Sequence, residues 1–206
     1  MRRAILTTVI VLGWIASSGT PAAANGWGGY LEYSGYSGSI SGNAAGRIDA
    51  DARGQRIGLG MAMDTNPLGE GLFNYRLDAG WVHSWEKLEQ DGRSFDYDSN
   101  GFSVNNAFGF RVYGNATTRL WVGPAIGAGV DNPDNDDLDV TVTLGGGPQI
   151  GLDLAAGDGY IVALTTGYQY RYRRQSVADP FGGNIGIDGG ENYWLFNVAL
   201  LYDVRD

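Results

Sequence analysis

Hydrophobic and polar residues alternate with a period of two along most of this chain. The segment YIVALTTGYQYRYRR (160–174) shows the pattern most clearly. Its second half has two opposed rows, Tyr168, Tyr170 and Tyr172 on one side and Gln169, Arg171 and Arg173 on the other. A period of two predicts a β-strand. A strand in a soluble protein would have to bury one of these rows. The pattern therefore raises the question of which solvent each face of the strand contacts.

The same period predicts eight strands, separated by connections that alternate in length. The expected strands are about 27–36, 54–64, 71–85, 101–113, 118–130, 138–154, 160–174 and 191–204. The long polar connections are 37–53, 86–100 and 175–190, with a shorter acidic one at 131–137. The short ones are TNPLGE (65–70), GNAT (114–117) and AAGDG (155–159). Tight turns at one end and longer loops at the other are typical of an outer-membrane barrel, with the long loops outside.

One face of every expected strand lacks Asp, Glu, Lys and Arg. This face contains residues such as Leu59, Trp81, Ile126, Leu144 and Val198. A basic residue facing the middle of a bilayer costs about 2–4 kcal/mol, so this exclusion indicates contact with lipid. A soluble eight-stranded barrel would instead have to pack the large outward rings into a narrow lumen. The pattern therefore predicts an all-β fold, an eight-stranded antiparallel up-and-down transmembrane β-barrel.

Pro124 and Pro148 interrupt neighbouring strands, and a bulge is expected there because proline removes a ladder donor.

Aromatic residues lie near both ends of the outward rows. In the segment 73–85, two aromatic side chains precede Leu77 and Ala79, and two follow them. Amphipathic rings favour the headgroup level of a membrane, so two aromatic girdles are expected. The candidate girdle residues are Phe73, Tyr75, Trp81, Trp85, Tyr160, Tyr168, Tyr170, Tyr172, Trp194, Phe196 and Tyr202.

The opposite face of the strands carries glycines, small polar residues and charges of both signs. An eight-stranded barrel is just wide enough for side chains to fill it, and an isolated buried charge is too costly. We therefore expect an ion-paired polar plug, with Glu191 opposite Arg171 or Arg173. The inward charged residues are Glu32, Arg56, Asp64, Arg76, Asp78, Arg111, Arg119, Asp153, Arg171, Arg173, Glu191 and Asp203.

Residues 1–24 have the features of a secretory signal peptide. Arg2 and Arg3 precede a short apolar run at 4–16, and small alanines end the segment at Ala24. Cleavage there would leave 25–206 as the barrel domain. Without the two arginines, the net charge of −9 becomes −11, which argues against nucleic acid or anionic lipid headgroups as direct partners. The absence of cysteine excludes disulfides and thiolate metal sites, and no cofactor is expected.

The chain resembles the small outer-membrane β-barrel family, of the OmpA-like and OmpX-like kind, over residues 27–204. The resemblance rests on the strand pattern described above and implies a monomer in the cell outer membrane of a Gram-negative envelope. Lipid, lipopolysaccharide and the barrel-insertion machinery are the partners that it implies. Barrels of this family usually end on an aromatic residue, whereas Tyr202 is followed here by Asp203-Val204-Arg205-Asp206.

His83 is the only histidine and the main candidate for chemistry. The resemblance raises barrel enzymes that deacylate or acylate lipid A from the membrane face. Ser84 is adjacent to His83 and therefore points to the opposite face of a strand. Asp98 and Ser99 follow in the expected loop and could approach His83 as in an acyl-transfer site. The favoured interpretation is an interfacial histidine between two tryptophans, without catalysis.

The segment DNPDNDDLD (131–139) concentrates carboxylates in an expected outer loop. Oxygen-rich loops bind Ca²⁺, but the glycine and distal glutamate of an EF-hand are missing here. A solvated acidic turn is favoured over a metal site. The weak Ca²⁺ candidates are Asp131, Asp134, Asp136 and Asp137.

The sequence thus predicts an outer-membrane barrel with a structural or surface-interaction role carried by its outer loops. Two alternatives stay open. One is a lipid A-modifying enzyme that uses His83, and the other is a narrow, porin-like passive channel through the charged interior. Loops of this kind carry binding without a transferable code, so no ligand follows from the sequence.

Overall fold

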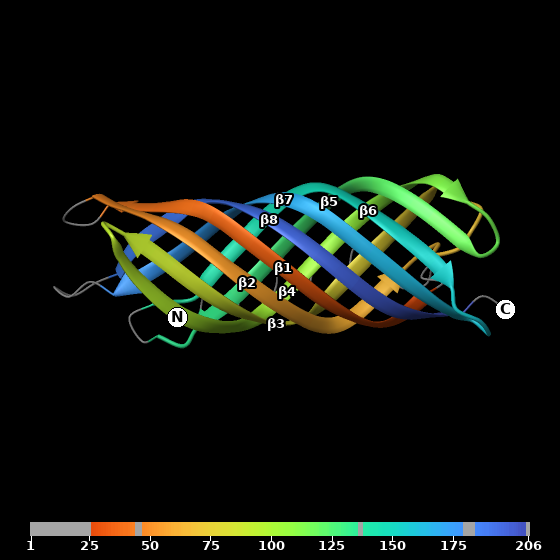
Figure 1. Cartoon of the computed structure of the whole chain (residues 1–206), viewed down its shortest axis with the longest axis horizontal. Helices are drawn as coiled ribbons and strands as arrows, with labels where there is room; N and C mark the ends of the chain where they lie inside the picture. Colours follow the sequence, from red (N-terminus) through yellow and green to blue (C-terminus); the bar gives the residue numbers. More distant parts are fainter. Residues whose placement is uncertain (1–25, 44–46, 136–137, 179–183, 205–206) are drawn as a thin grey trace.

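The computed structural model describes residues 26–43, 47–135, 138–178 and 184–204. These residues form eight antiparallel strands in which each pairs with the next and β8 returns to β1, closing a barrel (Figure 1). The predicted eight-stranded up-and-down barrel is therefore confirmed. The strands are β1 (Gly26–Asn43), β2 (Arg47–Asp64), β3 (Phe73–Gln90), β4 (Arg93–Gly114), β5 (Thr118–Pro133), β6 (Thr141–Ala155), β7 (Tyr160–Ala178) and β8 (Asn184–Asp203). No helix among the described residues is long and apolar enough to cross a membrane.

The strands are longer than the sequence predicted, and the extra length lies at one end of the barrel. The expected loops 37–53, 86–100 and 175–190 are mostly strand, because β1–β2, β3–β4 and β7–β8 continue as hairpins. The expectation of long loops was therefore wrong. Asp91 and Gly92 both have positive φ, of 50° and 74°, as a two-residue type I′ turn requires. An Asp-Gly pair is a strong hairpin signal, and it lies in the middle of the expected loop 86–100.

The connections at the other end of the barrel are short, as predicted. They are 65–72, 115–117 and 156–159. The last of these turns through Gly157 and Gly159, whose φ angles of 88° and 83° favour glycine. The first strand begins and the last strand ends at this same end, where Gly26 of β1 pairs with Asp203 of β8. The membrane orientation expected from the sequence places this end in the periplasm, and it is called the periplasmic end below.

The prediction of a bulge at Pro124 and Pro148 was wrong. Pro124 of β5 lies opposite Pro148 of β6. The pairing of β5 with β4 is interrupted at Pro124, and that of β6 with β7 is interrupted at Pro148, without any change of register. The bulge lies instead in β4, between Arg111 and Tyr113. Each proline therefore removes a donor without adding a residue to its strand, and the outward row continues through it.

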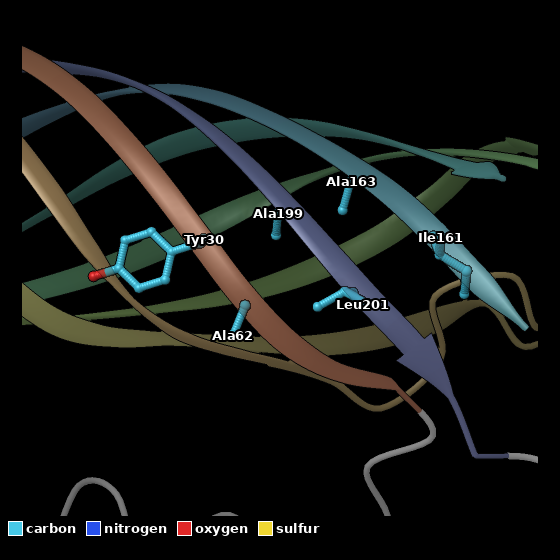
Figure 2. Close-up of a cluster of buried hydrophobic side chains, with 6 residues drawn as sticks. All are labelled: Tyr30, Ala62, Ile161, Ala163, Ala199 and Leu201. Carbon is cyan, nitrogen blue, oxygen red and sulfur yellow. The ribbon is translucent and has the colours of Figure 1, made fainter.

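The barrel has apolar clusters inside both of its ends. Figure 2 shows the cluster at the periplasmic end, which comprises Tyr30, Ala62, Ile161, Ala163, Ala199 and Leu201. Leu68 of the β2–β3 turn packs against this cluster. The cluster at the outer end comprises Ile40, Ala50, Ala52 and Ile187, with Leu88 packed against it. Polar side chains fill the interior between these two clusters, and Asp64, Arg119 and Asp153 lie at the level of the periplasmic one.

Candidate functional site

Arg173 is the centre of the interior ion pairs toward the outer end. Its Nη1 lies 2.6 Å from Glu86 Oε2 and 3.0 Å from Glu191 Oε1, and its Nη2 donates to Tyr97 Oη at 2.6 Å. All four side chains are buried. Glu191 lies directly opposite Arg171 in the β7–β8 ladder, yet its ion pair is with Arg173, one inward position further along β7.

A second ion pair joins strands on opposite sides of the lumen. Arg56 Nη2 of β2 lies 2.6 Å from Asp131 Oδ2 of β5, and Arg56 Nε donates to Ser84 Oγ at 2.9 Å. Both charged side chains are buried. A buried, charge-assisted pair of this length holds two strands that share no ladder.

Amide side chains fill the middle of the lumen. Arg171 Nε donates to Gln169 Oε1 at 2.9 Å, and Gln169 Nε2 donates to Asn105 Oδ1 at 2.8 Å. Gln149 exchanges hydrogen bonds with Asn105 across the lumen, at 3.2 and 3.3 Å. The guanidinium group of Arg171 lies 3.4 Å over the ring centre of Tyr193, which is a cation–π contact. These contacts form a continuous polar layer across the barrel.

Glu32 and Asp78 accept hydrogen bonds on the periplasmic side of this layer. Tyr193 Oη donates to Glu32 Oε1 at 2.8 Å. Arg76 Nε lies 3.1 Å from Asp78 Oδ1, and Arg76 Nη2 donates to Asn197 Oδ1 at 2.9 Å. These contacts link β1, β3 and β8 through the interior.

Asp153 differs from the other inward carboxylates because neither of its oxygen atoms makes a hydrogen bond, although the side chain is fully buried. Arg76 and Arg119 interact with it electrostatically. Arg119 also donates to backbone carbonyls of the β2–β3 turn, at Asn66 and Gly69. Arg111 is only partly buried beside the β4 bulge and takes no part in an ion pair among the described residues.

Together, the buried charges form a packed column. Among the described residues, seven buried carboxylates face five buried guanidinium groups. Glu86, Tyr97 and the three central amides belong to this column but were not among the predicted site residues, and Asp131 was predicted only as a weak Ca²⁺ candidate. The first two lay within the expected loop 86–100, and only the hairpin register turns them inward.

His83 lies on the outward face of β3, between two tryptophans. Its ring stacks on Trp81 with centroids 6.0 Å apart and meets Trp85 edge-on at 4.6 Å. Its Nδ1 is 3.0 Å from Asn100 Oδ1, and its Nε2 is 3.9 Å from Asp98 Oδ2.

The structure does not assemble the catalytic group His83, Asp98 and Ser99. Asp98 approaches His83, but Ser99 faces the lumen, where its Oγ donates to Glu86 Oε1 at 3.1 Å. Ser84 also faces inward and accepts from Arg56. Neighbouring residues of a strand point to opposite faces, so neither serine reaches the imidazole.

The acidic segment divides between the lumen and the outer surface. Asp131 belongs to β5 and pairs with Arg56 inside the barrel, so it is not a loop ligand. Asp134 accepts a hydrogen bond from the backbone N–H of Asp98 at 3.1 Å. Asp136 and Asp137 lie outside the described residues. Within the described part of the chain, no group of three or more His, Asp or Glu side chains could hold a metal ion.

The predicted girdle residues lie on the outer wall of the barrel. Rings of neighbouring strands pack in pairs toward both ends of this wall, for example Tyr160 against Tyr202 at 5.5 Å and Tyr33 against Trp194 at 5.4 Å. All candidates except Tyr75 are exposed. Tyr75 is half-buried because its hydroxyl donates to Asn106, which lies on the same face.

No protein-family model matches the sequence, and no curated protein matches it either. Among solved structures, the outer membrane protein OprG from Pseudomonas aeruginosa is similar, with a TM-score of 0.60 and 11% sequence identity. The match covers 85% of this chain and 95% of OprG. The fold is that of a small outer-membrane β-barrel. Neisserial surface protein A also matches, over 84% of this chain and 97% of its own, but at a TM-score of 0.31 and 12% identity.

Proposed function

We propose that this chain is an integral protein of the outer membrane, with a structural or surface-interaction role. The observation that carries the proposal is the difference between the two faces of each strand. The outer wall presents a broad band of exposed apolar and aromatic side chains, while the charges lie in the lumen or beyond the band. Such a wall is stable only in contact with lipid, and the projecting hairpins are then left to meet partners outside the cell.

Neither alternative function is favoured by the geometry. The lumen is crossed by ion pairs and by the layer of Asn105, Gln149 and Gln169, which opposes a passive channel. A lipid A-modifying enzyme would need a nucleophile beside His83, and both nearby serines face the lumen.

Cell fractionation with a gel-mobility assay tests the proposal. The protein is expected in the outer-membrane fraction, as a monomer that migrates differently before and after boiling, because a folded barrel resists detergent. A soluble protein with heat-insensitive mobility would contradict it.

Steady, ion-selective conductance in planar bilayers would contradict the closed lumen. A change of lipid A acylation that His83→Ala abolishes would instead support the enzyme.

A further inference from the structure

At the outer end, one stretch of β4 projects past its neighbour β5. β3 and β4 pair up to their turn, and β1 pairs with β2 and with β8 nearly to its own end. The pairing of β4 with β5, in contrast, begins only at Ser99, opposite Pro133. Among the described residues, the segment 93–98 therefore has β3 as a partner strand on one side and no partner strand on the other.

The backbone groups of Ser94 and Asp96 point to this unpaired side. Asp98 shows the direction, because its carbonyl oxygen accepts from the Asp134 N–H at 2.9 Å and its own N–H donates to Asp134 Oδ1 at 3.1 Å. Backbone groups along a strand point alternately to its two sides, so those of Ser94 and Asp96 point the same way as those of Asp98. Unpaired donors and acceptors along such an edge are a template for an additional strand.

The lumen face of this edge is aromatic. Phe95 and Tyr97 lie on it, opposite Leu88 and Glu86 of β3, and their rings are 5.8 Å apart. Phe95 is 43% exposed although it lies beyond the expected lipid band, whereas Leu88 packs against the outer apolar cluster. The apolar packing inside the outer end thus extends to the edge, where one large ring remains uncovered.

The outer face of the same edge is acidic. Asp96 lies opposite Lys87, and Asp98 follows on the same face two positions later. Asp134 lies beside Asp98, and both Asp96 and Asp134 are exposed. The amino group of Lys87 contacts Glu89 at 3.1 Å, so the three aspartates keep a net negative charge beside the edge.

We propose that the β4 edge binds an extended peptide segment of another protein at the cell surface, which adds as a strand beside Ser94 and Asp96. The segment has basic residues at alternate positions, beside Asp96 and Asp98, with an apolar residue between them beside Phe95. Strand addition takes its affinity from main-chain hydrogen bonds and its specificity from alternate side chains, and charge complementarity selects the basic residues here. The inference rests on the proposed surface-interaction role and gives that role a site and a class of partner.

The test uses the hexapeptide Lys-Val-Lys-Val-Lys-Val as the probe. Isothermal titration calorimetry measures its binding to the purified barrel in detergent, with empty micelles as the blank. The same peptide with glutamate in place of lysine is expected to bind about tenfold less tightly, because like charges would then face each other across the edge. Added salt should weaken the binding of the lysine peptide.

Ser94→Pro removes one N–H of the unpaired side and leaves the β3–β4 ladder intact, because this N–H points away from β3. It is expected to weaken binding about fivefold, which corresponds to one hydrogen bond of about 1 kcal/mol. Asp96→Asn together with Asp98→Asn should weaken binding of the lysine peptide by a similar factor. Asp51→Asn is the matched control, an exposed carboxylate of β2 away from the edge, and should bind like the wild type.

Amide hydrogen exchange, followed by NMR, shows where the peptide lies. The N–H groups of Ser94 and Asp96 should exchange more slowly when the peptide is bound, while that of Phe95, which faces β3, should not change. The proposal would be overturned by an absence of binding, by equal binding of the two peptides, or by equal binding to the wild type and Ser94→Pro.

Cell fractionation separates this inference from the proposed function. If the wild type is absent from the outer membrane, the proposed function fails. If it is present there with heat-modifiable mobility and the β4 edge binds no basic peptide, only the inference about the edge fails.

Discussion

The two ends of the barrel are closed in different ways. At the periplasmic end, the strands stop at the lipid band, and short turns cover an apolar cluster around Ile161 and Leu201. At the outer end, the hairpins continue past the aromatic girdle with polar residues on their outer wall. They enclose a buried charge cluster around Arg173 and a second apolar cluster around Ile40. Both ends combine buried charges with apolar packing, since Asp64, Arg119 and Asp153 lie at the periplasmic end. They differ because the outer charges lie within hairpins that project beyond the girdle.

The difference follows from the solvent on the outer wall. Where lipid surrounds the strands, the outward row must be apolar, and the buried charges lie on the inward row. Beyond the girdle, water surrounds the wall, so an inward apolar cluster gains the ordinary hydrophobic stabilisation. The projecting part of the barrel therefore has a polar outer wall and the part below it has an apolar one, while the interior of each part holds both charges and an apolar cluster.

Removing the central arginine of the outer cluster is expected to give the largest loss. Arg173→Ala leaves Glu86 and Glu191 buried without their partner, at a cost of about 3–5 kcal/mol in the free energy of unfolding. The measurement is urea unfolding in liposomes, followed by tryptophan fluorescence. Arg174→Ala, one residue away on the exposed face, is the control and should change stability by less than about 0.5 kcal/mol. Equal effects would show that the cluster does not hold the outer end together.

The apolar cluster at the periplasmic end should give the next largest effect. Leu201→Ala removes a fully buried side chain and is expected to cost about 2–4 kcal/mol through lost burial and the cavity left behind. Leu200→Ala changes the neighbouring side chain, which is exposed on the outer wall where lipid contact is proposed. Lipid tails can fill the space that it leaves, so the same unfolding measurement should show a clearly smaller loss. A Leu200→Ala loss as large as that of Leu201→Ala would reverse the assigned faces.

These pairs also show what could and could not be predicted from the sequence. The lipid-facing rows were predictable because a bilayer excludes charge from every outward position of a strand. Beyond the girdle, outward residues such as Ser39, Asp51 and Arg53 are polar, and the stretch resembled a loop. Only the ladder, which pairs Arg53 with Lys87 and turns Glu86 and Tyr97 inward, shows the strand and its interior partners. Glu191 forms its ion pair with Arg173 and not with Arg171, which lies opposite it. This selection depends on the length and conformation of the side chains, which the strand register alone does not determine.

A single charge placed on the outward row should locate the boundary between the two parts. Leu59→Arg places a guanidinium group in the lipid band and is expected to cost about 2–4 kcal/mol. Ser41→Arg places the same group on the projecting part of β1, opposite Asp49, and should be nearly neutral. Unfolding free energies in liposomes measure both. A large loss for Ser41→Arg would mean that lipid reaches further along the hairpin than the girdle indicates.

The smallest effect is expected at Glu89, on the outer wall of the projecting β3–β4 hairpin. A hydrogen bond from Lys87 and the nearby charge of Arg53 lower the pKa of the Glu89 carboxyl group. A carboxyl group whose pKa is lower in the folded state stabilises the fold above its unfolded pKa, and this contribution disappears as the pH falls through the folded value. Because the group is exposed and screened, Glu89→Gln should barely change stability at neutral pH.

NMR titration of the Glu89 side chain should show a midpoint below the usual glutamate value, and Lys87→Ala together with Arg53→Ala should return it to that value. A midpoint that stays low in the double variant would mean that groups other than this basic pair hold the carboxylate, and that the pair is not oriented by Glu89.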